Sequence, residues 1–155
     1  MTAIQTNPVV RLEIASQPEL LAGARALIAA MAQRCGFNEI MCGQISLAVD
    51  EALCNIIKHG YNCREDERIW ISISITETEP KSIKIIIEDT ADQIEVSEIR
   101  SRDLDDVRPG GLGVHIIKEI MDVVEYEHRQ PRGMRLTLIK TNKPSQAREN
   151  KEQKT

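Results

Sequence analysis

Hydrophobic residues recur along the chain with two spacings, one typical of strands and one typical of helices. Apolar and polar side chains alternate over Val9–Ile14 and over Ile69–Ile75, which predicts two half-buried strands. Ile83–Glu88 is almost continuously apolar and predicts a central strand. Val124–Arg129 and Met134–Lys140 flank a short turn containing proline and glycine, so they predict a final hairpin.

The remaining apolar residues recur at helical spacing and predict three helices. Ser16-Gln17-Pro18-Glu19 has the pattern of a capping box, followed by a helix that we expect to end at Gly36. Asn38 is the expected N-cap of a second helix, which should end near Gly60. A third helix is predicted over Leu112–Val124.

The order of these elements is strand, helix, helix, strand, strand, helix, strand, strand. It predicts an α+β fold, a two-layer α/β sandwich in which three helices cover one face of a mixed, mostly antiparallel sheet. We expect a single domain over residues 1–141 and a disordered polar tail over residues 142–155. Residues 89–109 are polar and long for a loop in a compact domain, so a functional lid is expected there.

Composition narrows the classes of function. The formal net charge is −4 and only 3% of the 155 residues are aromatic, which argues against binding of nucleic acid by charge or by base stacking. No apolar run approaches the length of a membrane span, and the N-terminus lacks the charged and then apolar order of a signal peptide. We therefore expect a cytoplasmic protein with no membrane segment.

The four cysteines do not suggest a metal site or a disulfide framework. Their spacing contains no CxxC pair, and the three histidines are not at the spacing of zinc ligands. The expected state is a set of reduced thiols, mostly buried as small apolar groups.

One polar row on the second predicted helix indicates a functional surface. Glu51 and Asn55 are four residues apart and therefore share a helix face, and His59 extends the row by another turn. Asn is a poor helix former, so its position in mid-helix suggests a use such as metal coordination. The alternative is a solvated helix flank. Asp89, at the end of an apolar strand, could accept a hydrogen bond from an amino group, or it could simply begin a turn.

A second segment predicts an anion site. Gly110, Gly111 and Gly113 lie where the third helix begins, and glycines allow the backbone to approach an anion at a helix N-terminus. The alternative is flexible entry into the helix. The segment is not a Walker loop, and no βαβ unit surrounds it as a dinucleotide fold would require.

The two segments together resemble a known family. Glu51–Tyr61 and Pro109–Ile117, the latter followed by Met121-Asp122, are similar to the conserved boxes of the bacterial anti-sigma-factor serine/threonine kinases. Those kinases belong to the histidine-kinase-like ATPase superfamily, and the resemblance covers roughly residues 8–140. The predicted order of strands and helices agrees with that family's α/β sandwich.

The resemblance implies roles for individual residues. Glu51 would be the general base that takes the proton from a substrate serine, and Asn55 would bind the Mg²⁺ that bridges the ATP phosphates. Asp89 would hold the adenine amino group with Thr137 nearby, and Arg108 could approach the outermost phosphate. The remaining contacts to ATP would come from Ala91, Gly110, Gly111, Leu112, Gly113 and Val114.

The chain departs from the family in the adenine box, which commonly has the pattern Asp-x-Gly-x-Gly. Here Ala91 and Gln93 replace the two glycines, and a lost position with φ above zero would reshape the turn. The sequence leaves open whether this altered box supports tight binding of ATP.

The resemblance also implies partners. Family members sequester a sigma factor, phosphorylate a serine of an antagonist protein, and often form homodimers. The main alternative is a nucleotide-responsive binding module with little or no kinase activity. An acid–base hydrolase that uses Glu51 and His59 is less favoured, because two helical turns, roughly 12 Å, separate the two groups.

Overall fold

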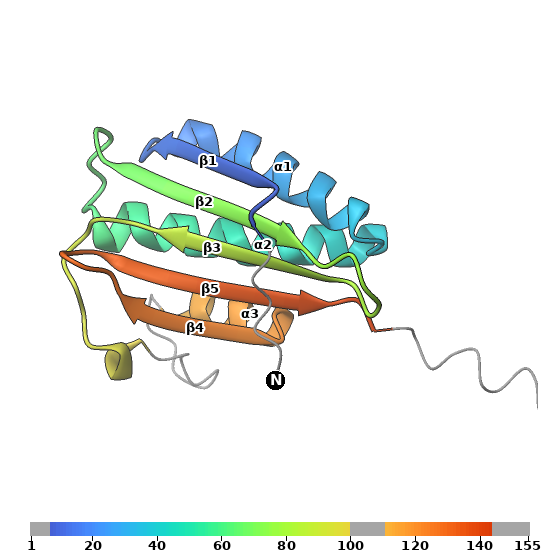
Figure 1. Ribbon diagram of the computed structural model, residues 1–155. Helices are drawn as coiled ribbons and strands as arrows, with labels where there is room; N and C mark the ends of the chain where they lie inside the picture. Colours follow the sequence, from blue (N-terminus) through green and yellow to red (C-terminus); the bar gives the residue numbers. More distant parts are fainter. Residues whose placement is uncertain (1–6, 100–110, 144–155) are drawn as a thin grey trace, which may run out of the picture.

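Five strands form one sheet in the order β1-β2-β3-β5-β4 (Figure 1). The computed structural model describes residues 7–99 and 111–143. Every neighbouring pair of these strands is antiparallel, so the predicted α+β sandwich is confirmed, and the described sheet contains no parallel pair where a mixed sheet was expected. The strands are β1 (Val10–Ala15), β2 (Arg68–Ile75), β3 (Ser82–Glu88), β4 (Val123–His128) and β5 (Met134–Thr141).

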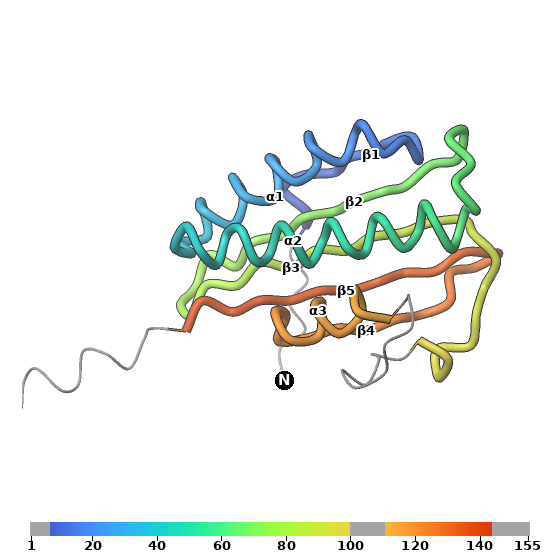
Figure 2. The backbone as a smooth tube through the Cα atoms, turned by 180° about the vertical axis from the view of Figure 1, so that it is seen from behind, coloured from blue at the N-terminus to red at the C-terminus, as the bar shows by residue number. Residues whose placement is uncertain are grey.

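Three helices, α1 (Leu21–Arg34), α2 (Glu39–Asn55) and α3 (Leu112–Ile120), cover one face of this sheet. Figure 2 shows α2 across the middle of the sheet, with α1 and α3 on either side of it. The buried side chains between the two layers are almost all aliphatic, because the chain has few aromatic residues. The largest aliphatic side chains that are fully buried are Ile28, Ile45, Leu53, Ile69, Ile71, Ile73, Ile83, Ile85, Ile87, Ile117 and Leu138.

The central helix begins and ends as its sequence indicates. Asn38 is the N-cap of α2, and its Oδ1 accepts a hydrogen bond from the Met41 N–H at 2.8 Å. After Asn55 the helix continues as one π-helical turn, Ile56–Gly60, of a kind that is frequent at functional sites. The whole helix Glu39–Gly60 is long and apolar enough to cross a membrane, but 44% of its most apolar window is buried inside the fold, as in a core helix.

Two local predictions were wrong. Ser16 does not cap a helix, because its hydroxyl bonds the Arg64 carbonyl and the Glu67 N–H, and a 3-10 turn, Pro18–Leu20, precedes α1 instead. The third helix ends at Ile120, not at Val124. Met121 is extended and buried in the core, so the chain can pair with β5 from Val123 onward.

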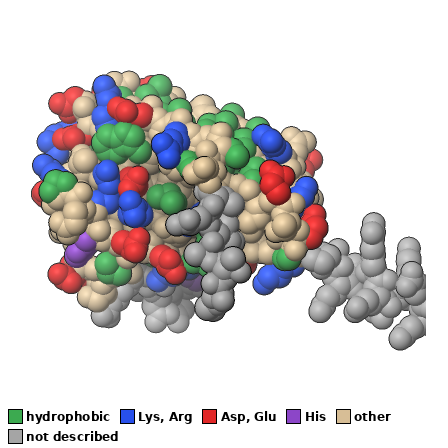
Figure 3. Space-filling view, in the orientation of Figure 1, with side chains coloured by type: hydrophobic (Ala, Val, Ile, Leu, Met, Phe, Trp, Pro, Cys, Tyr) green, Lys and Arg blue, Asp and Glu red, His purple; other side chains and the backbone are tan. Residues whose placement is uncertain are grey.

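The uncovered face of the sheet is mixed in charge. Figure 3 shows acidic and basic side chains interspersed across this face. Glu88 contacts both Arg129 and Arg135, and the guanidinium of Arg129 lies 5.3 Å from the centre of the Trp70 ring. Arg129 also donates to the main-chain carbonyl of Asp89 at 2.6 Å. This network therefore fixes the end of β3, where the candidate site begins.

The boundary of the domain stays a prediction. Residues 144–155 of the predicted tail and residues 100–109 of the predicted lid lie outside the described residues. The part of the loop that is described contains a short 3-10 turn, Val96–Glu98.

Candidate functional site

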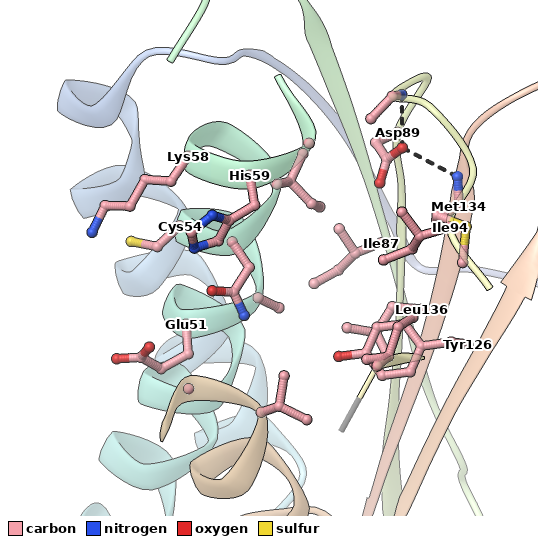
Figure 4. Close-up of a pocket in the computed structure, with 18 of the residues that line it drawn as sticks. Glu51, Cys54, Lys58, His59, Ile87, Asp89, Ile94, Tyr126, Met134 and Leu136 are labelled. Carbon is pink, nitrogen blue, oxygen red and sulfur yellow. Dashed lines mark hydrogen bonds between the residues drawn. The ribbon is translucent and has the colours of Figure 1, made fainter. Parts of the chain in front are cut away.

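A cavity of about 610 Å³ lies between the sheet, the C-terminal half of α2 and the first turn of α3. This volume is within the usual range for sites that bind small molecules. Figure 4 shows its two walls, with Glu51, Cys54, Lys58 and His59 on the helical side and the strand residues opposite. The cavity brings together most of the site residues expected from the sequence: Glu51, Asn55, Asp89, Ala91, Gly111, Leu112, Gly113 and Val114.

The polar row of α2 lies directly against the beginning of α3. A β-carbon added to Gly113 would lie 2.6 Å from Oε2 of Glu51 and 3.5 Å from Nδ2 of Asn55. An added methyl group would therefore clash with the Glu51 carboxylate, whereas Asn55 would stay at ordinary contact distance. The row is therefore part of a shared site and not a solvated helix flank.

The N-terminus of α3 offers free backbone donors to this cavity. Gly111 is the N-cap with φ +86°, a left-handed conformation that favours glycine, and it has no side-chain cap. The first N–H groups of a helix have no partner within the helix, so they can bind an anion. Arg108 and Gly110, which were predicted to contact phosphate, lie outside the described residues.

Asp89 is a buried carboxylate at the far end of the cavity. It is 5% exposed, and its Oδ1 accepts hydrogen bonds from the N–H groups of Ala91 at 2.9 Å and Met134 at 3.1 Å. Burial raises the pKa of Asp89, although those two N–H groups and the Arg129 charge oppose the shift. Its other oxygen has no partner among the described residues and remains available to a ligand (Figure 4).

The altered adenine box keeps a well-formed turn. Among the described residues other than glycine, positive φ occurs only at Asn62 and Cys63, so Ala91 does not need the conformation that a glycine would provide. The Ala91 methyl is buried beside Gly60, where an added β-carbon would approach it to 3.1 Å. The side chain of Gln93 donates to the carbonyls of Arg129 and Gly133, which ties the box to the final hairpin.

The prediction for Thr137 was wrong. Side chains alternate along a strand, and the cavity is lined by Met134 and Leu136 of β5 but not by Thr137. Thr137 pairs with Ile86 and Glu125 and lies on the face of the sheet away from the helices. The alternation of Leu136 and Leu138 with Thr137 was the signal that could have excluded it.

Sequence reasoning missed several polar residues of the cavity, among them Lys58 and Tyr126. Lys58 lies one turn beyond Asn55 on the helical wall and supplies a positive charge. Tyr126 of β4 stands in the opposite wall beside Leu136, and its hydroxyl points toward α2 (Figure 4). Burial raises the pKa of Tyr126 to about 12.

The described part of the chain, residues 7–99 and 111–143, contains no cluster of acidic, histidine or cysteine side chains that could hold a metal ion. Asn55 lines the cavity, and its side chain carries one amide oxygen. That donor set suits Mg²⁺, which is commonly held by one or two side chains and by the phosphates of its substrate.

Comparison with known proteins decides the family. Residues 14–140 match the histidine kinase-like ATPase domain. The chain belongs to that family. The family expected from the two sequence boxes is thereby confirmed.

Relatives of known activity are similar over most of the chain. A serine-protein kinase RsbW of Oceanobacillus iheyensis is 27% identical over 128 residues, which cover 77% of this chain and 79% of that protein. The serine-protein kinase RsbW of Staphylococcus aureus is 26% identical over 151 residues, which cover 92% of each chain. The RsbW of Bacillus subtilis is 24% identical over 127 residues, which cover 77% of this chain and 78% of that protein.

A solved structure supports the fold. The SiaB–SiaC complex from Pseudomonas aeruginosa contains a chain that superposes with a TM-score of 0.58 at 10% identity, covering 89% of this chain and 92% of that chain. At such low identity the likeness concerns the fold alone.

Proposed function

We propose that this protein is a serine kinase that transfers the γ-phosphoryl group of ATP to a serine of a partner protein. The observation that carries the proposal is that one cavity joins Glu51, Asn55 and the N-terminus of α3 to the buried Asp89. The relatives named serine-protein kinase support the same activity.

In this proposal one end of the cavity binds the adenine base of ATP and the other end binds its phosphates. The free oxygen of Asp89 accepts a hydrogen bond from the adenine amino group, and Ala91 packs beside the base. The phosphates lie at the other end, against the backbone of Gly111, Leu112, Gly113 and Val114 and below Lys58. Arg108 and Gly110 are proposed to complete the phosphate contacts.

Glu51 is proposed as the general base. Its carboxylate accepts the proton of the substrate serine hydroxyl as the serine oxygen bonds to the γ-phosphorus. The bond from that phosphorus to the β–γ bridging oxygen breaks, and ADP leaves with the electron pair. Such a reaction depends mainly on positioning and electrostatics, and the close packing of Gly113 against Glu51 would position the base.

Asn55 is the residue proposed to hold Mg²⁺. The bound ion would neutralise charge on the phosphates. Asn55 itself would supply its amide oxygen, and its Nδ2 is the atom nearer to Gly113.

The proposed partners follow from the family resemblance and from the relatives. We infer that the chain sequesters a sigma factor, phosphorylates an antagonist protein, acts as a homodimer and works in the cytoplasm. The competing function, a binding module with little kinase activity, was motivated by Ala91 and Gln93. The well-formed turn at Ala91 removes that motive.

A matched pair of measurements tests the kinase. The purified chain is incubated with labelled Mg-ATP and candidate antagonist proteins, and phosphoserine is measured by mass spectrometry. Glu51→Gln keeps the size of the side chain but removes the base, so we expect loss of phosphoserine by a factor of about 10² or more with ATP binding retained. An unchanged rate in Glu51→Gln would remove Glu51 from the mechanism. Absence of ATP binding up to millimolar concentration would overturn the proposed function.

A further inference from the structure

The two tyrosines of this chain differ in how their hydroxyl groups are used. Tyr61 is fully buried, and its hydroxyl donates to the Arg68 carbonyl at 2.5 Å and accepts from the Thr90 N–H at 2.9 Å. The hydroxyl of Tyr126 has no hydrogen-bond partner among the described residues, although its ring is partly buried beside the core. A phenylalanine would pack as well at this position and would not bury a hydroxyl, so the fold alone gives no reason for tyrosine.

The position of Tyr126 relates it to one end of the cavity. Tyr126 is paired with Leu136, which is paired with Ile87, so the three side chains stand in one line across the sheet. All three line the cavity, and Asp89 follows two residues after Ile87. Neighbouring strands are about 4.8 Å apart, so Tyr126 is within reach of a group about the size of a nucleoside lying on this wall.

The groups that suit phosphate occupy the opposite wall. Asn55 is the last residue of α2, and Lys58 lies in the π-helical turn that continues it. Gly111 and Gly113 belong to the start of α3. The sheet wall is otherwise apolar, with Ile87, Met134 and Leu136 exposed to the cavity. A phenol in that wall is placed for the uncharged part of a nucleotide, whose ring nitrogens and ribose hydroxyls need hydrogen-bond partners.

We propose that the Tyr126 hydroxyl is a second recognition group for the nucleotide, which hydrogen-bonds the base or the ribose and not the phosphates. The inference rests on the proposed function, because it requires a nucleotide in this cavity. The phenol is protonated at physiological pH, as an ordinary tyrosine is, and it can therefore donate a hydrogen bond. Asp89 and Tyr126 would then hold the nucleoside through an acceptor and a donor.

Tyr126→Phe tests this contact in the full-length chain. We expect the dissociation constants of Mg-ATP, ADP and AMP, measured by calorimetry, to rise by a similar factor of about three to ten, the usual effect of one hydrogen bond. The melting temperature without nucleotide should be unchanged or higher. Tyr61→Phe is the matched control, because it removes the other phenol; its main expected effect is a lower melting temperature.

A spectroscopic measurement covers the case in which the Phe variant does not fold. The chain has two tyrosines, so wild-type protein labelled with ¹³C at tyrosine Cζ gives two signals. Saturation with AMP should shift the Tyr126 signal, because its hydroxyl gains a partner, and should leave the Tyr61 signal in place.

Each other outcome has a definite meaning. If wild type binds Mg-ATP and Tyr126→Phe binds it equally well, the inference is overturned and the proposed function stands. A loss confined to ATP, with ADP and AMP unaffected, would assign the hydroxyl to the terminal phosphate and would overturn the nucleoside contact. If wild type binds none of the three nucleotides, both proposals are overturned.

Discussion

Gly113 and Glu51 are in contact: a β-carbon on Gly113 would lie 2.6 Å from Oε2 of the Glu51 carboxylate. The first turn of α3 therefore rests on the group proposed as the general base. Oε2 of Glu51 is at the end of a flexible side chain. A methyl group added at Gly113 would therefore move the Glu51 carboxylate and leave both helices in place.

Gly113→Ala is accordingly expected to separate activity from stability. The rate of phosphoserine formation should fall at least about tenfold because the base is displaced. The free energy of unfolding should change by less than about 1 kcal/mol, because alanine is the better helix former and offsets part of the crowding.

Gly43→Ala is the matched control for that prediction. Gly43 also lies within a helix, α2, and an added β-carbon would meet nothing within 4 Å. We expect a gain of roughly 0.5–1 kcal/mol in the free energy of unfolding and an unchanged kinase rate. Equal loss of activity in both variants would contradict the role given to Gly113.

Asp89→Asn should weaken nucleotide binding without unfolding the protein. The amide oxygen can still accept from the N–H groups of Ala91 and Met134. The amide NH₂ would then face the adenine amino group, so two donors meet and the dissociation constant of ATP should rise at least about tenfold. Calorimetric titration measures the change, and unchanged affinity would remove Asp89 from base recognition.

The same variant should show a defined pH dependence of stability. Burial raises the folded-state pKa of Asp89 above its ordinary value of 3.8, so its contribution to stability is fully present below that value and is lost as pH rises through the folded-state pKa. Asp89→Asn should therefore gain stability relative to wild type as the pH rises from about 3 to about 7. Urea unfolding at several pH values tests this.

Asp122→Asn is a control for which the opposite pH dependence of stability is expected. Burial alone would raise the pKa of Asp122, but bonds from the Thr141 N–H and from Lys140 hold it below the ordinary value. Its stabilising effect is present above the unfolded-state pKa and is lost as pH falls through the folded-state value. The variant should therefore lose stability near pH 7 and approach wild type at low pH. If the stability of the two variants relative to wild type changed with pH in the same direction, the opposite pKa shifts assigned to Asp89 and Asp122 would be contradicted.

Tyr61→Phe should destabilise the fold by about 1–3 kcal/mol, because it leaves the Thr90 N–H and the Arg68 carbonyl without their buried partner. Denaturant unfolding gives the free energy, and a change below about 0.3 kcal/mol would show that water replaces the hydroxyl.

Gly60 and Ala91 should be energetically coupled. A β-carbon on Gly60 would approach the Ala91 methyl to 3.1 Å, closer than ordinary contact. Gly60→Ala should therefore be better tolerated when Ala91→Gly is also present, with a coupling of about 1 kcal/mol in a double-mutant cycle. Ala91→Gly alone, which restores the glycine typical of the family, should leave the conformation of the turn unchanged because the turn does not use positive φ.

The features predicted correctly from sequence are those with a local cause. Asn38 caps α2 as its residue type indicates, and Glu51 and Asn55 meet on one helix face because helical geometry requires it. Gly113 lies against Glu51, a contact that was not predicted, and the anion site expected at these glycines stays a prediction. Local periodicity and backbone chemistry were sufficient for the cap and for the shared helix face.

The failures share a tertiary cause. Ser16 had the pattern of a cap, but its hydroxyl bonds a loop about fifty residues further along the chain. Met121 ended α3 early because the core and the pairing of β4 with β5 required an extended residue there. Tyr126 gave no local signal, since its relation to the cavity arises from the order of the strands. Contacts between residues that are far apart in the chain cannot be predicted from the sequence of one helix or strand.

Gly133 links the turn of the final hairpin to Asp89. Its φ is +95°, and a β-carbon there would lie 2.0 Å from the Asp89 carbonyl oxygen, so backbone meets backbone with no side chain between. Any larger residue at this position would push the carboxylate out of place. The turn thus fixes the position of Asp89 at the base-binding end of the cavity. Substitutions in this turn should therefore change which nucleotide is preferred more than they lower the stability of the hairpin.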